Sequence, residues 1–481
     1  MSKIYDSLIE YNKSNAYPFH MPGHKRHLCG DVLDEISQID ITEIDGFDNL
    51  HDAKGIIKEA QIRAARLYGA EESYFLINGS TCGILSAIAA CVPNGGWLMM
   101  GRNCHKAVYH AALLGGLKTF YVYPQIEEGY SFCDGLHLDE IRDSVNKFYK
   151  LYPAEKISAV IITSPTYEGM LSEVQEIAAF LHEKRIPLII DEAHGAHLGL
   201  AKQIPQNSCV LGADLVIHSL HKTLPAMTQT ALLHVNGTLV DRQRLRRYLS
   251  IYQTSSPSYV LMASIDRALT IMEENGEDYF KLFLERKKKL LQTLQDCKII
   301  RVYQGGYTDP CKLLLSTKGS LWTGKTLYDK LRLEYNLQME MAAGDYVVAI
   351  LTVMDSEEGF VRLQKAILEL DDELDKEMTD SKNKVHSCQN VERREKPSML
   401  FKAEPEYTIA EALDRPHEEV PYMQAEGRVS ADFVYLYPPG VPLLAPGEII
   451  TDDHICYLQK VQEQKLDLKG LKSNRISVLK N

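Results

Sequence analysis

The stretch PLIIDEAHGAH, residues 187–197, joins a short apolar run to two acids and two histidines. A run of this length is typical of a strand buried in a parallel sheet rather than of a helix. Asp191 follows the run directly. Ligands of an open α/β sheet bind outside the carboxyl ends of its strands, so we expect Asp191 to face a ligand. A helix cap or a salt bridge would also suit this acid, and His194 and His197, three residues apart, leave a metal site open.

Seven apolar runs of this kind alternate with longer helical patterns between residues 56 and 300. The strand candidates are Tyr74–Ile77, Trp97–Met100, Thr119–Tyr123, Ser158–Thr163, Pro187–Asp191, Asp214–His218 and Thr230–Val235. Most gaps between them are long enough for a crossover helix, which predicts an α/β fold with a mostly parallel, doubly wound sheet of seven strands. The gap at 222–229 is too short for a crossover, so the last strand is allowed to run antiparallel.

The sequence outside this unit divides into four further parts. Residues Tyr259–Leu294 have a helical pattern and lead out of the major domain. Strand candidates Cys311–Ser316 and Tyr346–Val353 then indicate a smaller α/β region. A polar, charged and aperiodic stretch then reads as a linker or exposed loop. The predicted division is an N-terminal arm (1–55), a major domain (56–300), a small α/β domain (301–375), a linker or exposed loop (376–399) and a C-terminal domain (400–481).

Composition excludes several classes of function. The 481 residues carry 53 Lys and Arg against 65 Asp and Glu, a net charge of −12. Nucleic-acid binding and polybasic membrane anchoring need a basic surface, so neither partner is expected. The ten cysteines include no C-x-x-C pair and read as reduced thiols. The N-terminus has no apolar signal segment, and Pro93 and its neighbours interrupt the most apolar stretch, so we expect a cytoplasmic protein that acts on a small molecule.

Two further motifs follow other strand candidates. The sequence NGSTCG, residues 78–83, precedes a helical run, and its small hydroxyl residues suit a phosphate cradle at a helix N-terminus. A simple helix cap by Ser80 or Thr81 is the alternative. The sequence SLHKT, residues 219–223, follows the strand ADLVIH. A lysine at such a strand end can form a Schiff base when its pKa is depressed, although most lysines are solvated surface residues.

The motifs say more together than apart. A phosphate cradle, a strand-end acid and a strand-end lysine follow successive strands in that order. Pyridoxal phosphate needs an anion site, a carboxylate for its pyridine nitrogen and an imine-forming lysine. The segment RNCHK, residues 102–106, follows the second strand candidate, so His105 is placed to stack on the cofactor ring, with a structural histidine as the alternative.

Two other patterns compete with this interpretation. The sequence GSLWTGKT, residues 319–326, fits a P-loop, but its Leu and Trp are bulky and no further strand series follows to complete a nucleotide-binding sheet. The sequence PFHMPGHKRH, residues 18–27, suggests metal binding. Pro22 prevents a regular helix there, so the spacing of His20 and His24 loses its meaning, and an arm packed near an active site is the plainer account. We expect no metal.

The whole set of motifs resembles a known family. These motifs are PFHMPGHK, DNLHDAKGIIKEAQ, NGSTCG, RNCHKAV, SPTYEG, DEAHG, SLHKTLPAMTQTALL, TSSPSYVLMASID and YPPGVPLLAPGEIIT. They resemble the bacterial ornithine/lysine/arginine decarboxylases of the aspartate-aminotransferase fold, in the short form that lacks the N-terminal wing domain. The resemblance implies a pyridoxal phosphate enzyme that converts a basic amino acid to an amine and carbon dioxide in polyamine-related metabolism. It also implies a homodimer or higher homo-oligomer with shared active sites.

The resemblance also implies roles for individual residues. Lys222 corresponds to the Schiff-base lysine, Asp191 to the acid that pairs with the pyridine nitrogen, and His105 to the ring-stacking histidine; His105 or Lys222 would return a proton to the substrate. Further cofactor contacts would come from Ser80, Thr81, Cys82, His194, Ser219, His221 and from Ser255 or Ser256, which would reach the phosphate of a neighbouring subunit. Candidate acids for the distal cation of the substrate are Glu448, Asp45 and Asp48, each of which also suits a structural or surface role.

Some alternatives stay open at this point. The sequence does not indicate the length of the substrate side chain, so lysine, arginine and ornithine all stay open as substrates. An aminotransferase would share the fold and the Lys–Asp pair but usually needs an arginine for the α-carboxylate, which we cannot place. A P-loop ATPase and a non-enzymatic homologue are the remaining alternatives. The charge of −12 would attract a cationic amino acid.

Overall fold

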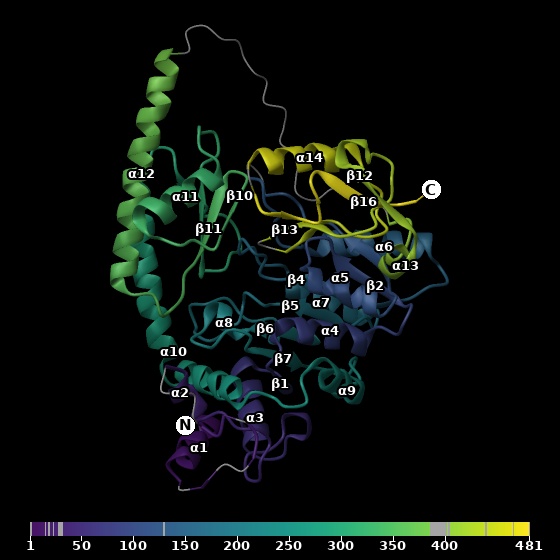
Figure 1. The fold of residues 1–481 in the computed structure, drawn as a ribbon, viewed down its shortest axis with the longest axis vertical. Helices are drawn as coiled ribbons and strands as arrows, with labels where there is room; N and C mark the ends of the chain where they lie inside the picture. Colours follow the sequence, from purple (N-terminus) through teal and green to yellow (C-terminus); the bar gives the residue numbers. More distant parts are fainter. Residues whose placement is uncertain are drawn as a thin grey trace. The chain divides into compact units, whose positions relative to one another are not determined.

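A seven-stranded sheet organises the fold of the computed structural model (Figure 1). The structure describes residues 2–14, 16–17, 20–22, 24–26, 32–127, 130–384, 402, 405–437, 440–464 and 466–480. The strand order is β1-β7-β6-β5-β4-β2-β3. The strands are β1 (Glu72–Leu76), β2 (Trp97–Gly101), β3 (Lys118–Val122), β4 (Ile157–Thr163), β5 (Leu188–Asp191), β6 (Leu215–Ser219) and β7 (Ala231–Val235).

The strand directions explain where a site can form. β4, β5 and β6 are parallel, and β7 runs antiparallel to both β6 and β1. β1 therefore points the same way as β4, β5 and β6, and their carboxyl ends share one edge of the sheet. All seven strands were predicted to within two residues at each end, and the antiparallel course of the last strand is confirmed. Its cause is the short connection after β6, which cannot hold a crossover helix.

Helices precede, connect and follow the strands of this sheet. They are α3 (Ile56–Tyr68), α4 (Gly79–Cys91), α5 (Lys106–Leu114), α6 (Leu138–Leu151), α7 (Val174–Glu183), the single turn α8 (Leu220–Thr223), α9 (Arg242–Tyr252) and α10 (Tyr259–Leu294). α4 buries most of its residues. A Cβ at Gly83 would lie 2.6 Å from Leu76 Cδ1, so glycine lets α4 approach β1 closely.

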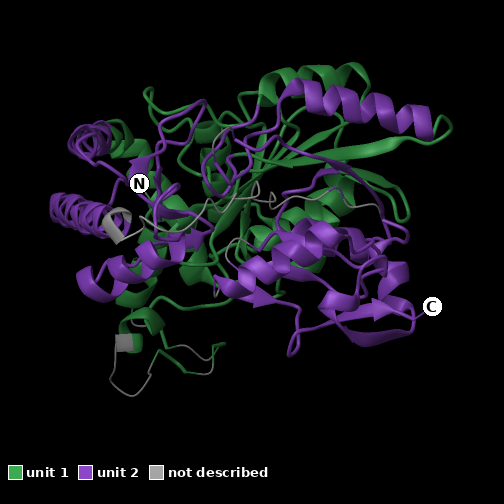
Figure 2. Ribbon diagram, turned by 90° about the horizontal axis from the view of Figure 1, so that it is seen from above, with its two compact units in different colours: residues 1–99, 152–164, 173–280 green, residues 100–151, 165–172, 281–481 purple. Residues whose placement is uncertain are grey.

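The chain divides into two compact units, neither of which is a continuous segment (Figure 2). The first unit contains residues 1–99, 152–164 and 173–280, and the second contains 100–151, 165–172 and 281–481. Three elements of the N-terminal arm belong to the first unit: α1 (Lys3–Lys13), α2 (Val32–Ser37) and η1 (Leu50–Asp52). The five-part division by sequence remains a prediction. Among the described residues, no helix has the length and apolar character that a membrane-spanning segment needs.

The second unit adds three small sheets. The first is antiparallel and contains β8 (Arg301–Val302), β9 (Lys312–Ser316), β10 (Met341–Ala343) and β11 (Tyr346–Ile350). The other two contain β12 (His417–Pro421) with β16 (Arg475–Leu479), and β13 (Val434–Leu436) with β14 (Pro442–Leu444) and β15 (Leu468–Lys469). The predicted strands Cys311–Ser316 and Tyr346–Val353 correspond to β9 and β11.

The helices of the second unit correct one prediction. They include α11 (Gly324–Tyr335), α12 (Glu357–Lys384), α13 (Ile409–Asp414), η2 (Tyr422–Gln424) and α14 (Asp452–Glu463). α12 continues into the predicted linker, so residues 376–384 are helix rather than aperiodic chain. Acidic and basic residues dominate this part of the helix, and their polarity hid the helical pattern. Residues 385–399 lie outside the described residues.

Candidate active site

Asp191 is the last residue of β5 and lies buried at the edge where the parallel strands end. Asp191 is 3% exposed, and its Oδ1 accepts a hydrogen bond from the backbone N–H of Ala193 at 3.2 Å. Burial raises the pKa of Asp191, while the charge of Lys222 opposes this shift. A carboxylate in this setting gains from a cationic donor, because burial disfavours its charge when no cation is near.

Lys222 lies on α8, which follows β6 directly. The Lys222 Nζ atom is 3.0 Å from His194 Nε2, and His194 is itself buried in the turn after β5. β5 and β6 are neighbours in the sheet, with Asp191 paired to Ile217. The sequence-based expectation that the acid and the lysine meet at one sheet edge is therefore confirmed. A lysine as the partner of His194 also argues against the alternative that this histidine binds a metal.

The start of α4 provides the features of an anion site in the same unit. Ser219 Oγ donates a hydrogen bond to Ser80 Oγ at 2.9 Å, so the last residue of β6 meets the first turn of α4. The N-cap residue Asn78 makes no side-chain capping bond; its Oδ1 accepts from the backbone N–H of Thr254 at 3.2 Å. No acidic residue lies in the first turn. Two hydroxyls at a helix start that favours negative charge suit a phosphate group.

The neighbours predicted for this cradle differ in their surroundings. Thr81 is exposed, whereas Cys82 is buried and its thiol donates to the Gly79 carbonyl at 3.0 Å. Burial raises the pKa of Cys82 to about 12, so the thiol stays neutral. His221 Nδ1 is 3.0 Å from the Thr230 carbonyl oxygen, which makes Nδ1 the donor. Burial lowers the pKa of His221, so its ring is neutral and Nε2 can accept a hydrogen bond.

Ser255 and Ser256 are exposed and directly follow Thr254, whose backbone contacts Asn78. The segment therefore lies beside the start of α4 in its own chain. The resemblance implied a contact with the phosphate of a neighbouring subunit, and that assignment remains a prediction.

His105 belongs to the second unit, where it forms the N-cap of α5. Its Nδ1 accepts a hydrogen bond from the backbone N–H of Ala107 at 3.2 Å, so the proton of the neutral ring sits on Nε2. A Cβ at Gly440 would lie 3.2 Å from both Cδ2 and Nε2 of His105. The backbone N–H of Lys106 donates to the Gly440 carbonyl at 3.0 Å. The stacking role of His105 remains a prediction.

Sequence reasoning missed Gly440 as a residue that shapes the surroundings of His105. Its φ of +82° is a conformation that favours glycine. The Pro-Pro-Gly run was a visible turn signal, but nothing in the sequence linked that turn to a histidine more than 300 residues away.

Glu448 occupies the interior of the second unit rather than an open site. It is 0% exposed, and its Oε2 accepts hydrogen bonds from Arg102 Nη2 at 3.0 Å and from the backbone N–H of Ala445 at 2.8 Å. Burial by itself would lower the pKa of Arg102, but the Glu448 carboxylate and the neighbouring tyrosines together hold that pKa above its ordinary value. The buried pair favours the structural alternative for Glu448 over binding of a substrate cation.

The two acids in the N-terminal arm also have surroundings that favour structural or surface roles. The Asp48 carboxylate accepts backbone N–H donors at the start of α3, including Gly55 at 2.7 Å and Lys54 at 2.9 Å. Burial would raise the pKa of Asp48, but these donors lower it below its ordinary value. Asp45 is exposed. The carboxylate of Asp48 is thus engaged as a cap of α3.

Two sequence models of known families match the chain. The model described as "Orn/Lys/Arg decarboxylase, major domain" matches residues 2–332, and "Orn/Lys/Arg decarboxylase, C-terminal domain" matches residues 389–475.

The chain belongs to the Orn/Lys/Arg decarboxylase family.

Characterised and uncharacterised relatives are similar to this chain over nearly its whole length. An uncharacterised Bacillus subtilis protein, YaaO, is 33% identical over 97% of this chain and 95% of its own length. An arginine decarboxylase of Bacillus anthracis is 28% identical over 99% of this chain and 96% of its own length. The inducible lysine decarboxylase of Escherichia coli is 24% identical over 95% of this chain, which covers 76% of that longer protein. The chain thus covers nearly all of the arginine decarboxylase and about three quarters of the longer lysine decarboxylase.

Solved structures of low identity support the fold. A lysine decarboxylase from Francisella novicida superposes with a TM-score of 0.81 at 18% identity, over 100% of this chain and 81% of that one. An alanine–glyoxylate aminotransferase from Nostoc sp. gives a TM-score of 0.54 at 14% identity, over 67% and 88% of the two chains. The predicted aminotransferase-like α/β fold is therefore confirmed.

The P-loop-like motif of this decarboxylase-family chain has a different structure from a phosphate loop. Thr323 Oγ1 accepts from the backbone N–H of Thr326 at 3.1 Å and caps α11. Lys325 forms an ion pair with Asp329 one turn along the helix. A Cβ at Gly324 would collide with the backbone of β11, so this glycine serves helix-on-strand packing. The surrounding sheet is antiparallel, unlike a nucleotide-binding sheet.

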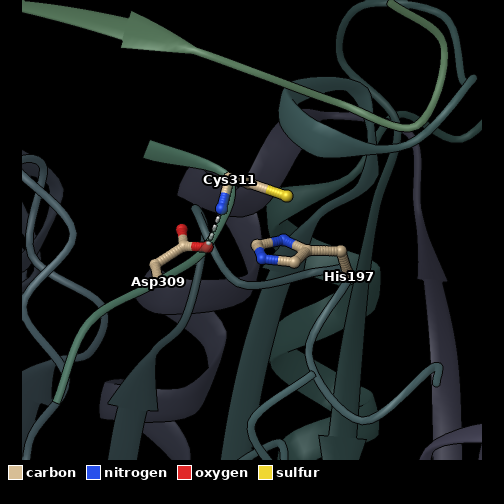
Figure 3. A group of neighbouring side chains, drawn as sticks. All are labelled: His197, Asp309 and Cys311. Atoms are coloured by element: carbon tan, nitrogen blue, oxygen red, sulfur yellow. Dashed lines mark hydrogen bonds between the residues drawn. The ribbon is translucent and has the colours of Figure 1, made fainter. Parts of the chain in front are cut away.

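The residues for which a metal site was considered make the following contacts. Figure 3 draws His197 with Asp309 and Cys311. Within the second unit, Asp309 Oδ1 accepts the backbone N–H of Cys311 at 2.8 Å, just before β9 begins (Figure 3). Within the first unit, the His197 ring is 6.3 Å from the Phe280 ring. In the N-terminal arm, His20 and His24 contact Tyr11 and Asp40. Pro18, Phe19, Gly23 and His27 of the PFHMPGHKRH segment lie outside the described residues.

Proposed function

We propose that this chain uses pyridoxal phosphate to decarboxylate a basic amino acid. The observation that carries the proposal is the convergence, within one unit, of buried Asp191, Lys222 and the hydroxyl-lined start of α4. The cofactor has a pyridine nitrogen, an aldehyde and a phosphate, and this set of side chains offers one suitable group for each. The match to the decarboxylase family supports the same cofactor.

The fit of the residues to this cofactor is chemical. Asp191 is buried with a raised pKa, so a protonated ring nitrogen would supply the cation that its charge lacks. Ser80, whose hydroxyl oxygen accepts the Ser219 proton, would donate its own proton to the phosphate, together with the backbone N–H groups of the first turn of α4, and Ser219 would orient that hydroxyl. When bound, the cofactor supplies an electron sink that stabilises the charge left at Cα when carbon dioxide departs.

The other residues hold and move protons. The Asp191 carboxylate keeps the proton on the ring nitrogen. His194 Nε2, 3.0 Å from Lys222 Nζ, accepts a hydrogen bond from the lysine and fixes its orientation. With the cofactor and substrate bound, Lys222 or His105 would return a proton to Cα of the substrate. Neutral His221 offers an acceptor beside the cradle.

The substrate class follows from the family and from charge. Relatives of similar length are named arginine decarboxylases, and longer ones are named lysine decarboxylases. A net charge of −12 would raise the local concentration of a cationic amino acid. We therefore propose arginine, lysine or ornithine as the substrate, with arginine as the first to test, and an amine that enters polyamine metabolism as the product.

We also propose a cytoplasmic homodimer. None of the eight described cysteines forms a disulfide, as expected for a reducing compartment. Large apolar side chains are exposed on the N-terminal arm and on α3, where a second copy would cover them. They are Tyr5, Leu33, Ile36 and Ile62. Analytical ultracentrifugation should give about twice the monomer mass of 54.4 kDa.

The proposed cofactor is tested by spectroscopy of the purified protein. Wild type should acquire a visible absorption band on addition of pyridoxal phosphate, and the band should survive gel filtration. Lys222→Ala should lose that band, whereas Lys325→Ala, a lysine in the P-loop-like motif, should keep it. A wild-type protein that takes up no pyridoxal phosphate would overturn the proposal. Amino transfer to a keto acid without release of carbon dioxide would replace it with the aminotransferase alternative.

A further inference from the structure

A chain of hydrogen bonds between buried polar side chains crosses the first unit behind the proposed cofactor site. Ser73 Oγ on β1 is 2.6 Å from His234 Nδ1 on β7. His234 Nε2 is 3.1 Å from His218 Nδ1 on β6. His218 Nε2 is 2.8 Å from Glu192 Oε1, just after β5. All four residues are at most 3% exposed. The chain therefore links four neighbouring strands inside the core.

The donors in this chain have one consistent direction. Ser208 donates its backbone N–H to Glu192 Oε2 at 3.1 Å, and its hydroxyl donates to the same oxygen. Burial lowers the pKa of His218 to about 3 and that of His234 well below its ordinary value, so both rings are neutral. Because the Glu192 carboxylate accepts, His218 carries its proton on Nε2. His218 Nδ1 then accepts from Nε2 of His234, and His234 Nδ1 accepts from the hydroxyl of Ser73. Every donor points toward Glu192.

An aromatic side chain packs on the two histidines without joining this chain. The Tyr68 ring centroid is 4.7 Å from that of His218 and 4.7 Å from that of His234. The Tyr68 hydroxyl instead donates to the Ala196 carbonyl at 2.6 Å. Tyr68→Phe therefore removes one buried hydrogen bond and leaves the Ser–His–His–Glu chain intact, which makes it a matched control.

Two members of this chain, Glu192 and His218, are next in sequence to residues of the proposed site. Glu192 directly follows Asp191, and His218 directly precedes Ser219, with Lys222 four residues further on. We propose that the Glu192–His218–His234–Ser73 chain positions the carboxyl ends of β5 and β6 and so fixes the acid, the lysine and the phosphate contact relative to one another. The residues act through their neighbours and are positioning residues. This role rests on the proposed use of pyridoxal phosphate.

Stability alone does not explain why the core contains this chain of polar side chains. Apolar residues of similar volume often stabilise a core as well as a buried polar network does. A fully satisfied network instead specifies one arrangement of the elements that carry it. The expected difference is that breaking the chain alters the cofactor site beyond what an equal loss of stability would.

The test compares three variants by affinity for pyridoxal phosphate, by the visible circular dichroism of the bound cofactor and by thermal unfolding. His218→Leu removes both hydrogen bonds and leaves Glu192 without one of its donors. We expect its dissociation constant for the cofactor to rise about tenfold, because the loss of a hydrogen-bond donor from a buried charged group has a free-energy cost that corresponds to a change of about this size. The visible ellipticity should change as well. His218→Gln, which offers both a donor and an acceptor, should stay near wild type.

Tyr68→Phe should lower the unfolding temperature but leave the affinity and the visible spectrum unchanged. If His218→Leu behaves as Tyr68→Phe does, the positioning role is wrong, even though wild type binds the cofactor. If wild type binds no cofactor, the proposed function itself fails. Should His218→Leu not fold, Ser73→Ala decides: a weaker affinity with an altered ellipticity supports the role, and a lower unfolding temperature alone overturns it.

Discussion

Removing the Glu448 carboxylate should destabilise the protein by about 3–5 kcal/mol, the usual cost of leaving a buried charge without its partner. Arg102 has a side chain that is 2% exposed, and Glu448 Oε2 lies 3.0 Å from its Nη2. In Glu448→Ala the guanidinium would keep the carbonyl acceptors of Pro442 and Leu443. Neither carbonyl carries the negative charge that balances a buried cation, so most of the penalty should remain.

The assay is urea unfolding followed by circular dichroism, together with steady-state kinetics on the preferred amino acid. Glu448→Ala should shift the unfolding midpoint strongly to lower urea. Glu418→Ala is the matched control, because Glu418 pairs with Arg428 at 2.8 Å near the surface, where ion pairs contribute little. The double variant Arg102→Met with Glu448→Leu should recover much of the lost stability, since it removes both charges together.

The kinetic result separates the two roles of Glu448. A structural acid predicts that folded Glu448→Ala keeps a KM near that of wild type. A KM that rises strongly while the urea midpoint stays unchanged would refute this reasoning and restore Glu448 as an acceptor for the substrate cation.

Three other outcomes follow from the same geometry. Asp48→Ala should lower the free energy of unfolding by about 0.5–2 kcal/mol through loss of the cap on α3. The pKa of Asp48 is lowered in the folded state, so the stability difference from wild type should vanish as acid protonates Asp48. A stability difference that persists in acid would contradict this role of Asp48. Gly440→Ala should displace His105 and reduce kcat, and should also lower the urea midpoint modestly because the φ of +82° strains alanine; an unchanged kcat would argue against a contact role for Gly440. Burial lowers the pKa of His454 to about 4, so protonation of the unfolded chain should cost stability as pH falls from about 6.5 to about 4. His454→Gln, which keeps the capping box with Thr451, should lose part of this pH dependence in urea titrations, and an unchanged slope would contradict the assignment.

The strands and the strand-end motifs were predictable because short-range patterns determine them. Apolar runs of four to seven residues gave the sheet, and the short connection after β6 gave the antiparallel strand. The meeting of Asp191 and Lys222 followed from the rule that parallel strands end at one edge.

The roles of isolated acids were not predictable from local sequence. Glu448 and Asp48 lie in motifs of the family, yet their partners are Arg102, more than 300 residues away in the chain, and backbone N–H groups of a following helix. His218 was predicted only as the end of a strand, and nothing local linked it to His234, because only the pairing of β6 with β7 brings the two histidines together. Long-range burial, which a single sequence does not display, decides these cases.

The central claim is that Lys222 enables a cofactor-dependent decarboxylation. The most direct measurement is release of labelled carbon dioxide from carboxyl-labelled arginine, lysine and ornithine by the protein saturated with pyridoxal phosphate. The account predicts steady release from at least one of them by wild type and by Lys325→Ala, and none above background by Lys222→Ala. No release by wild type from any of the three, or equal release by Lys222→Ala, would contradict it.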